Sequence, residues 1–154
     1  LRPEVPLPHT GTAGRQTVIL VDASVWIDVL RDRSGQRGDR LRTEVADDAL
    51  LFARWTQFEL LAGARDEVDW LRLETELSHK PYAELTAALW RDSARIAFDL
   101  RRRGLTVRSA ADLCLAQTAL DHDALVLHRD SDFATIAQVR PLRQRYLQWD
   151  DTSR

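Results

Sequence analysis

The sequence predicts an α/β fold in which a central, mostly parallel sheet is covered by helices on both of its faces. Short apolar runs of strand length alternate along the chain with longer segments in which apolar residues recur at helical spacing. Acidic residues stand at the ends of these apolar runs or inside the helical segments that follow them. The chain has 154 residues, which is the size of one domain with a substantial core. These three observations favour a single three-layer α/β/α domain.

The first half of this domain is expected to begin with a strand and a helix. Residues 17–22 form an apolar run that suits a buried strand, and residues 24–31 follow with their apolar side chains on one helical face. Gly63 marks the end of one later helix. The leucines that recur between 71 and 77 mark the buried face of the next helix. The sequence further predicts a loop at 34–38, helices at 41–46, 56–65 and 68–79, and a strand at 49–52.

The second half is expected to begin with the longest helix, at 83–103, which Gly104 ends. Ser109 then suits the N-cap of another helix that extends to about residue 122, with Asp112 in the capping-box position three residues later. The remaining expectations are a strand at 124–128, a short helix from Ser131 and a last strand at 145–148.

The composition of the chain and of its two ends predicts the domain limits and the cellular location. Residues 1–15 contain three prolines and two glycines, which predicts a flexible tail before a domain at 16–150 and a short C-terminal tail at 151–154. No apolar run approaches the length of a membrane span. Cys114 is the single cysteine, which fits a cytoplasmic location and a place in the core. The net charge of −2 gives no overall basic field for nucleic acid.

Four carboxylates are placed where an open parallel sheet would gather them. Asp22 closes the first strand, Glu59 lies in a helix, Asp112 opens a helix and Asp130 follows a strand. Groups outside the carboxyl ends of parallel strands converge on one crevice. Carboxylates gathered there repel one another unless a cation joins them, and oxygen ligands suit Mg²⁺ or Mn²⁺. The pattern therefore predicts a metal-dependent enzyme that acts on phosphates.

The segments that hold these acids resemble the PIN domain, and more narrowly the VapC toxins of bacterial VapBC toxin–antitoxin pairs. The resemblance lies in four segments that follow one another in the expected order, each on the expected element: VDASVWID at 21–28, FELLAG at 58–63, ADL at 111–113 with Ala116 after it, and HRDSDF at 128–133.

This resemblance implies a PIN-like sandwich and a Mg²⁺- or Mn²⁺-dependent endoribonuclease. Such a toxin would cleave a structured RNA, a tRNA or an rRNA, at an exposed single-stranded loop and so inhibit translation. A cognate VapB antitoxin and a homodimer are implied as well. Residue by residue, the PIN pattern assigns Asp22, Glu59, Asp112 and Asp130 to catalysis and metal binding.

Several neighbours of these acids have two possible roles. Asp132 is either a fifth, water-mediated metal ligand or the cap of the helix from Ser131. Ser24 is expected to orient Asp22 or a metal-bound water, or to cap a helix itself. Strand alternation points His128 to the opposite face, so a structural role is expected. Asp28 is expected to be an exposed helix residue or part of a contact with a partner.

Arginines near the acids are candidates for contact with RNA phosphates or unpaired bases. Arg108 and Arg129 are the strongest of them because each lies close in sequence to a predicted metal ligand. A solvated face is the commoner explanation for the arginines at 91, 95 and 102. The five tryptophans are expected mainly in the core or in a subunit interface.

Two other classes of function fit parts of the pattern. One is a non-catalytic module that binds metal and RNA, or only the antitoxin, and four intact acids count against it. The other is a phosphatase or phosphotransfer domain with Asp22 as nucleophile. That class usually needs a lysine near the site, and the single lysine, Lys80, stands in an unsuitable stretch before Pro81.

Overall fold

A computed structural model describes residues 16–46 and 48–149, and the two predicted tails lie outside this range. The described chain contains the following strands and helices in order: β1 (Val18–Val21), α1 (Ala23–Arg31), α2 (Gln36–Glu44), β2 (Ala49–Ala53), α3 (Arg54–Ala62), α4 (Glu67–Leu77), β3 (Tyr82–Ala83), α5 (Ala87–Arg102), α6 (Ala110–Asp121), β4 (Leu125–His128), α7 (Asp132–Ile136) and β5 (Gln144–Tyr146).

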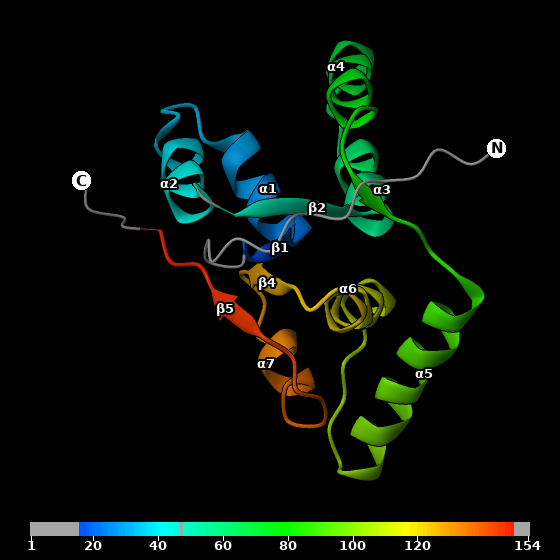
Figure 1. Ribbon diagram of the computed structural model, residues 1–154. Coiled ribbons are helices and arrows are strands. Elements are labelled where there is room, and N and C mark those ends of the chain that lie inside the picture. Colours follow the sequence, from blue (N-terminus) through cyan, green and yellow to red (C-terminus); the bar gives the residue numbers. More distant parts are fainter. Residues whose placement is uncertain (1–15, 47, 150–154) are drawn as a thin grey trace, which may run out of the picture.

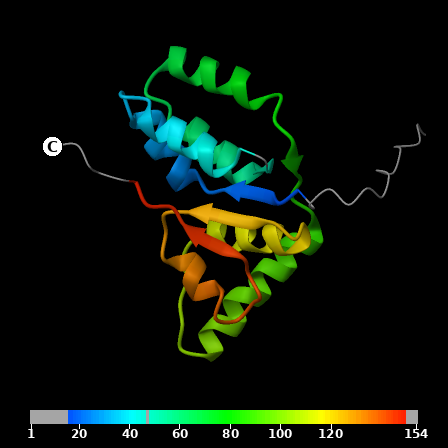
Figure 2. The ribbon, with the colours of Figure 1, turned by 60° about the vertical axis from the view of Figure 1, so that its left-hand side comes forward.

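The strands form one sheet in the order β3-β2-β1-β4-β5, and every neighbouring pair is parallel. Helices α1 to α4 lie on one side of this sheet, whereas α5, α6 and α7 lie on the other (Figures 1 and 2). The predicted three-layer α/β/α sandwich is therefore confirmed. Each of the strands β1 to β4 is followed by a helix, and helices on the two faces connect the parallel strands.

Alternating strand residues divide the core between the two faces. Ile19 and Val21 pack with Val25 of α1 on one face, whereas Leu20 packs with Ile96 and Leu115 of α5 and α6 on the other. This alternation follows from the two-residue period of a strand. Cys114 is buried in α6, as expected for a core residue. None of the described helices combines the length and the apolar character that a membrane crossing requires.

The structure corrects several predicted boundaries. The predicted loop at 34–38 is partly helical, because α2 begins at Gln36 after Gly35, whose φ of 78° only glycine adopts without strain. The predicted helix at 41–46 is thus the second half of α2. Helix α3 starts at Arg54, directly after β2, and ends at Ala62 rather than at residue 65.

A short strand that the sequence did not reveal stands where the long helix was expected to begin. Tyr82 and Ala83 pair with the end of β2 and form the edge strand β3. Helix α5 starts four residues later, because the Thr86 side chain accepts a hydrogen bond from the Leu89 N–H and caps the helix. The last strand, Gln144–Tyr146, starts one residue and ends two residues earlier than predicted.

Candidate metal centre

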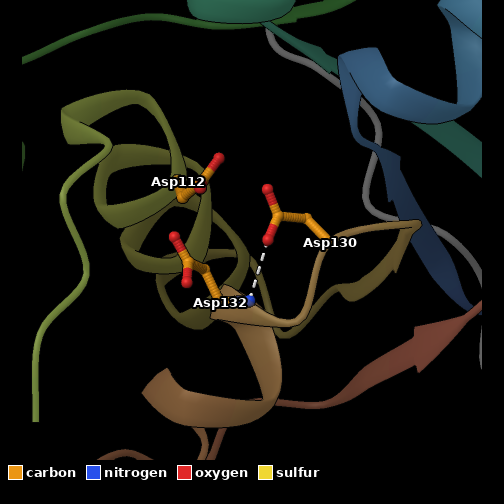
Figure 3. A group of neighbouring side chains, drawn as sticks. All are labelled: Asp112, Asp130 and Asp132. Atoms are coloured by element: carbon orange, nitrogen blue, oxygen red, sulfur yellow. Dashed lines mark hydrogen bonds between the residues drawn. The ribbon is translucent and has the colours of Figure 1, made fainter.

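The carboxyl ends of β1 and β4, which are neighbours in the sheet, bring two of the predicted acids to one edge. Asp22 follows β1, and Asp130 lies two residues after β4. Asp112 joins them from the first turn of α6, and Asp132 from the first residue of α7. Oxygens of Asp112, Asp130 and Asp132 all lie within 4.8 Å of one another. Figure 3 shows the three side chains gathered from α6, from the segment after β4 and from the start of α7.

Asp22 and Glu59 belong to the same electrostatic group. The negative charge of Asp22 helps to raise the pKa of Asp112 and of Glu59, which shows that all three carboxylates are close. Glu59 reaches the group from the middle of α3, on the side of the sheet opposite to α6. The four predicted acids thus come from four separate elements, and Asp132 is a fifth.

Hydrogen bonds fix Asp22 and connect it to the segment after β4. Asp22 Oδ2 accepts from the Ser24 N–H at 3.0 Å and from the Ser24 hydroxyl, so Asp22 is the N-cap of α1. The Ser24 hydroxyl in turn accepts from the Arg129 N–H at 3.1 Å. The expectation that Ser24 caps a helix itself is wrong, because the cap is Asp22. Ser24 orients Asp22 and ties it to the neighbouring strand end.

Asp132 does not cap α7, because it is the first residue of that helix and Ser131 is at the N-cap position. Asp130 Oδ1 accepts from the Asp132 N–H at 2.9 Å, whereas the Asp132 carboxylate joins the acidic group. Of the two roles considered for Asp132, the structure therefore contradicts capping. At the start of α6, the Ser109 hydroxyl accepts from the Asp112 N–H at 3.2 Å, which confirms Ser109 as the N-cap.

The ionised forms of these carboxylates are unfavourable, because they are partly buried and repel one another. Burial, together with the charges of Asp22, Asp130, Asp132 and Glu59, raises the pKa of Asp112 to about 7. Burial and Asp22 raise the pKa of Glu59, and burial and Asp130 raise that of Asp132. Within the described residues no lysine or arginine forms an ion pair with any of the five acids.

The donor set fits a hard divalent cation. Carboxylate oxygens are the ligands that Mg²⁺ and Mn²⁺ prefer, and a cation would relieve the repulsion that raises the pKa of Asp112. A cluster of acids that needed no cation would be expected to spread apart or to pair with arginines. Here the acids converge instead, although the chain contains 22 basic residues.

The two arginines predicted to contact RNA have different surroundings. Arg108 is exposed beside Ser109, at the entrance to α6. Arg129 points towards the C-terminal segment: its Nε lies 2.9 Å from Asp28 Oδ2, and its Nη1 donates to the Leu147 carbonyl at 2.8 Å. Contact of Arg129 with RNA would compete with these bonds, and for both arginines it stays a prediction.

Of the two roles expected for Asp28, the structure contradicts the exposed helix position, and contact with a partner stays a prediction. Asp28 Oδ2 accepts from the Trp149 indole N–H at 2.8 Å and pairs with Arg129, so Asp28 connects α1 to the end of the described chain. The Arg129 guanidinium also lies over the Trp149 ring, 5.7 Å from its centre. Arg91 and Arg95 pair with Asp92 and Asp99 on their own helix, which agrees with the solvated face expected there.

His128 is structural, as expected, but it has a second connection that the sequence did not indicate. It is 1% exposed and packs beside Phe133 of α7. The expectation that strand alternation points it away from the acids is wrong, because Phe133 lies in the core on the side of α6 and α7, from which Asp112 and Asp132 also come. His128 Nδ1 accepts from the Asp130 backbone N–H at 3.1 Å, and Nε2 lies 2.6 Å from Gln144 Oε1. The sequence indicated the contact with Asp130 only by placing the two residues close together, at positions 128 and 130. Nothing in the sequence indicated the contact with Gln144.

Comparisons with known proteins agree with this geometry. The family model of the PIN domain matches residues 19–139. The chain is 32% identical over 129 residues to VapC ribonuclease Mb1587 of Mycobacterium bovis and to ribonuclease VapC11 of Mycobacterium tuberculosis, with 82% of this chain and 96% of each relative covered.

Solved structures share the fold at low identity. FitAB bound to a DNA fragment matches with a TM-score of 0.67 and 19% identity over 86% of this chain and 99% of that one. VapBC2 from Rickettsia felis, also bound to DNA, matches with a TM-score of 0.66 and 14% identity over 86% of this chain and all of that one. Fold, acidic site and sequence similarity together establish that this chain belongs to the PIN-domain family and, within it, to the VapC proteins of toxin–antitoxin systems.

Proposed function

We propose that this protein is a Mg²⁺- or Mn²⁺-dependent endoribonuclease, the toxin of a toxin–antitoxin pair. Its substrate would be a structured RNA, a tRNA or an rRNA, cut at a single-stranded loop so that translation stops. The observation that carries the proposal is the convergence of Asp112, Asp130 and Asp132, whose oxygens lie within 4.8 Å of one another. The charges of Asp22 and Glu59 act on the same group. The ribonuclease names of the relatives support the choice of RNA as substrate.

The residues have separate tasks in this proposal. Asp22, Asp112 and Asp130 would hold the cation, with Glu59 and Asp132 beside them. A divalent cation bound there supplies positive charge to the phosphate and makes a bound water more acidic. Glu59, half-buried beside these ligands, is the carboxylate that we assign to take a proton from the attacking water.

A pocket next to Glu59 is the proposed binding place for part of the substrate. It has a volume of about 340 Å³, and Glu59, Arg31 and Arg33 are among the residues that line it. Arginine side chains at this position favour a phosphate-bearing ligand that extends from the carboxylates. A chain with unpaired bases can reach such a crevice, whereas a rigid duplex cannot, which favours a single-stranded loop.

The partners are proposed from the solved neighbours and from the surface. VapBC complexes are toxin–antitoxin assemblies, so a VapB antitoxin is the expected inhibitor. A homodimer would cover exposed aromatic residues of α3 and α5: Phe58 is 60% and Trp90 is 46% exposed, and both pack edge-on against Trp55. A cytoplasmic location follows if the substrate is a tRNA or an rRNA.

The experiment that tests the proposal measures metal binding and cleavage with the same proteins. We expect Mn²⁺ to bind to the wild-type protein in titration calorimetry, and we expect new RNA 5′ ends at one dominant position when total RNA is added. Asp22→Asn should weaken both, because it keeps the size of the side chain and removes its charge. Asp92→Asn, a surface acid on α5 paired with Arg91, is the matched control and should change neither.

The outcomes separate the competing functions. Metal and RNA binding without any new 5′ ends would favour the non-catalytic module. Cleavage that is equal for wild-type protein and folded Asp22→Asn would show that the RNA is cut elsewhere or by a contaminant, and the proposed site would be refuted.

A further inference from the structure

His128 uses both nitrogens of its ring although it is buried. Nε2 lies 2.6 Å from Gln144 Oε1, and Nδ1 lies 3.1 Å from the backbone nitrogen of Asp130. The ring is enclosed by Phe133 at 4.8 Å and by Tyr146 at 5.8 Å between ring centres. Both nitrogens of this buried ring are therefore satisfied, one by a side chain of β5 and the other by the backbone of Asp130.

These two partners require the same tautomer of a neutral imidazole. The Asp130 N–H can only donate, so Nδ1 must present its lone pair. The proton must then be on Nε2, and the partner of Nε2 must accept, which the Gln144 carbonyl oxygen does. The flipped amide of Gln144 would place an N–H against the Nε2–H, so only the orientation with Oε1 towards the ring satisfies both contacts.

The hydrogen bonds continue from this ring into the acidic site. The N–H that His128 accepts belongs to Asp130, and Asp130 Oδ1 accepts in turn from the Asp132 N–H. Gln144, His128 and Asp130 therefore connect the edge strand β5 with two carboxylates of the candidate metal centre. Side chains of this kind, one step behind the ligands, fix the orientation of ligands in metal sites.

We propose that His128 and Gln144 form a positioning relay, which holds the Asp130 backbone and thereby keeps its carboxylate in place for a divalent cation. This inference rests on the proposed function, because it needs a cation at Asp130. Gln144 selects the Nε2–H tautomer, and His128 uses that tautomer to hold Asp130. Both are positioning residues and neither contacts the substrate.

The sheet itself does not depend on the His128 side chain. Strands β4 and β5 are joined by backbone hydrogen bonds, the Leu147 N–H to the His128 carbonyl at 2.8 Å and the Val126 N–H to the Arg143 carbonyl at 2.9 Å. A change of the ring thus leaves strand pairing intact and removes the acceptor for Asp130. This separation makes the relay testable by substitution.

Three substitutions of His128 separate the effect of its contact with Asp130 from the effect of its contact with Gln144. In His128→Asn the side-chain oxygen can take the place of Nδ1 and accept from Asp130. In His128→Gln the amide reaches towards the place of Nε2, near Gln144, and no acceptor faces Asp130. His128→Leu keeps an apolar side chain and removes both contacts.

We expect Mn²⁺ to bind to His128→Asn within about threefold of the wild-type affinity, measured by titration calorimetry. His128→Gln and His128→Leu should bind at least about tenfold more weakly, the loss typical for residues that orient metal ligands. Hydrogen exchange of the Asp130 amide should follow the same order, protected in the wild type and His128→Asn and fast in the other two. Circular dichroism confirms that each variant is folded.

The tautomer gives a second measurement that needs no variant of His128. In ¹⁵N nuclear magnetic resonance spectra, the His128 ring of the wild-type protein should show the proton on Nε2. Gln144→Leu should produce a mixture of tautomers and a smaller loss of Mn²⁺ affinity than His128→Leu. A wild-type ring with its proton on Nδ1 would overturn the relay, even if every His128 variant failed to fold.

Two further results would also overturn it. One is unchanged Mn²⁺ affinity in folded His128→Gln and His128→Leu. The other is a loss in His128→Asn as large as in His128→Leu, which would mean that packing alone matters. Failure of the proposed function is distinguishable, because the wild-type protein would then bind no Mn²⁺ at all.

Discussion

Replacement of Asp112 by asparagine should make the metal-free protein more stable at neutral pH. This acid is 7% exposed, and burial together with four other carboxylates raises its pKa from 3.8 to about 7. In the folded protein without metal, the ionised form of Asp112 is therefore unfavourable. Asparagine has almost the same shape and carries no charge, so Asp112→Asn removes this cost.

The direction of the pH effect follows from the two pKa values. Between pH 3.8 and about 7, the unfolded chain has lost the Asp112 proton and the folded protein still holds it. Stability therefore falls as the pH rises through this window, and it levels off above about 7. Because one pKa unit corresponds to about 1.4 kcal/mol, the full destabilisation above pH 7 is about 4 kcal/mol.

Urea unfolding at a series of pH values from 4 to 8.5, with a chelator present, measures this effect. Wild type and Asp112→Asn should be equally stable at pH 4 to within about 1 kcal/mol, because both carry a neutral group there. The variant should gain on the wild type as the pH rises, by up to about 4 kcal/mol at pH 8. Titrating groups outside the acidic group cancel in the difference, and Asp92→Asn serves as the control that should show no such trend.

Addition of Mn²⁺ should reverse the order of stability. A cation that binds to the folded state stabilises it in proportion to the logarithm of its concentration over the dissociation constant, and Asp112→Asn loses a ligand. A difference between wild type and variant that stays flat from pH 4 to pH 8.5 would refute the reasoning. It would mean that Asp112 is ionised without cost, and that the repulsion inferred from the geometry does not exist.

Two further predictions concern charged residues outside this group. In a cleavage-deficient Asp22→Asn background, Arg108→Ala should weaken RNA binding and reduce the salt dependence by about 0.7 log units of affinity per log unit of salt. Arg91→Ala, which removes an exposed arginine elsewhere, should leave both unchanged, and equal behaviour of the two variants would count against Arg108. Asp69 accepts hydrogen bonds from Arg65 and Arg72, which hold its pKa well below the usual 3.8. Asp69→Asn should therefore be less stable than the wild type at pH 7. The difference in urea unfolding should shrink as the pH falls below 3.8 towards the lowered pKa of the folded state, because a lowered pKa stabilises only the ionised state.

The sequence predicted the positions of those acids that stand at the end of a strand or at the start of a helix. Asp22 and Asp130 were placed correctly because parallel strands end at one edge, and β1 and β4 are neighbours in the sheet. Asp112 was placed by its cap, since Ser109 fixed the start of α6. The position of Glu59 was the least determined by the sequence, because nothing local to a helical glutamate says which way its side chain points.

What the sequence did not reveal depends on contacts between distant residues. The direction of Arg129 is set by Asp28 and by the Leu147 carbonyl, which lie 101 positions before it and 18 positions after it. Strand β3 has two residues, too few to show any periodicity, and exists because β2 offers a free edge for Tyr82. In both places the missing information was tertiary, and no local propensity could have supplied it.

The alternatives of helix cap and metal ligand turn out to be compatible. Asp22 caps α1, Asp112 lies in the first turn of α6 and Asp132 in the first turn of α7. The positive end of a helix dipole and its free N–H groups favour a negative charge, so three helix starts stabilise carboxylates that repel one another. This stabilisation is incomplete, because the pKa of Asp112 is still raised to about 7. The fold thus holds the acids close enough to share one cation while leaving enough repulsion for that cation to relieve, which is the electrostatic condition for tight binding of a small divalent ion.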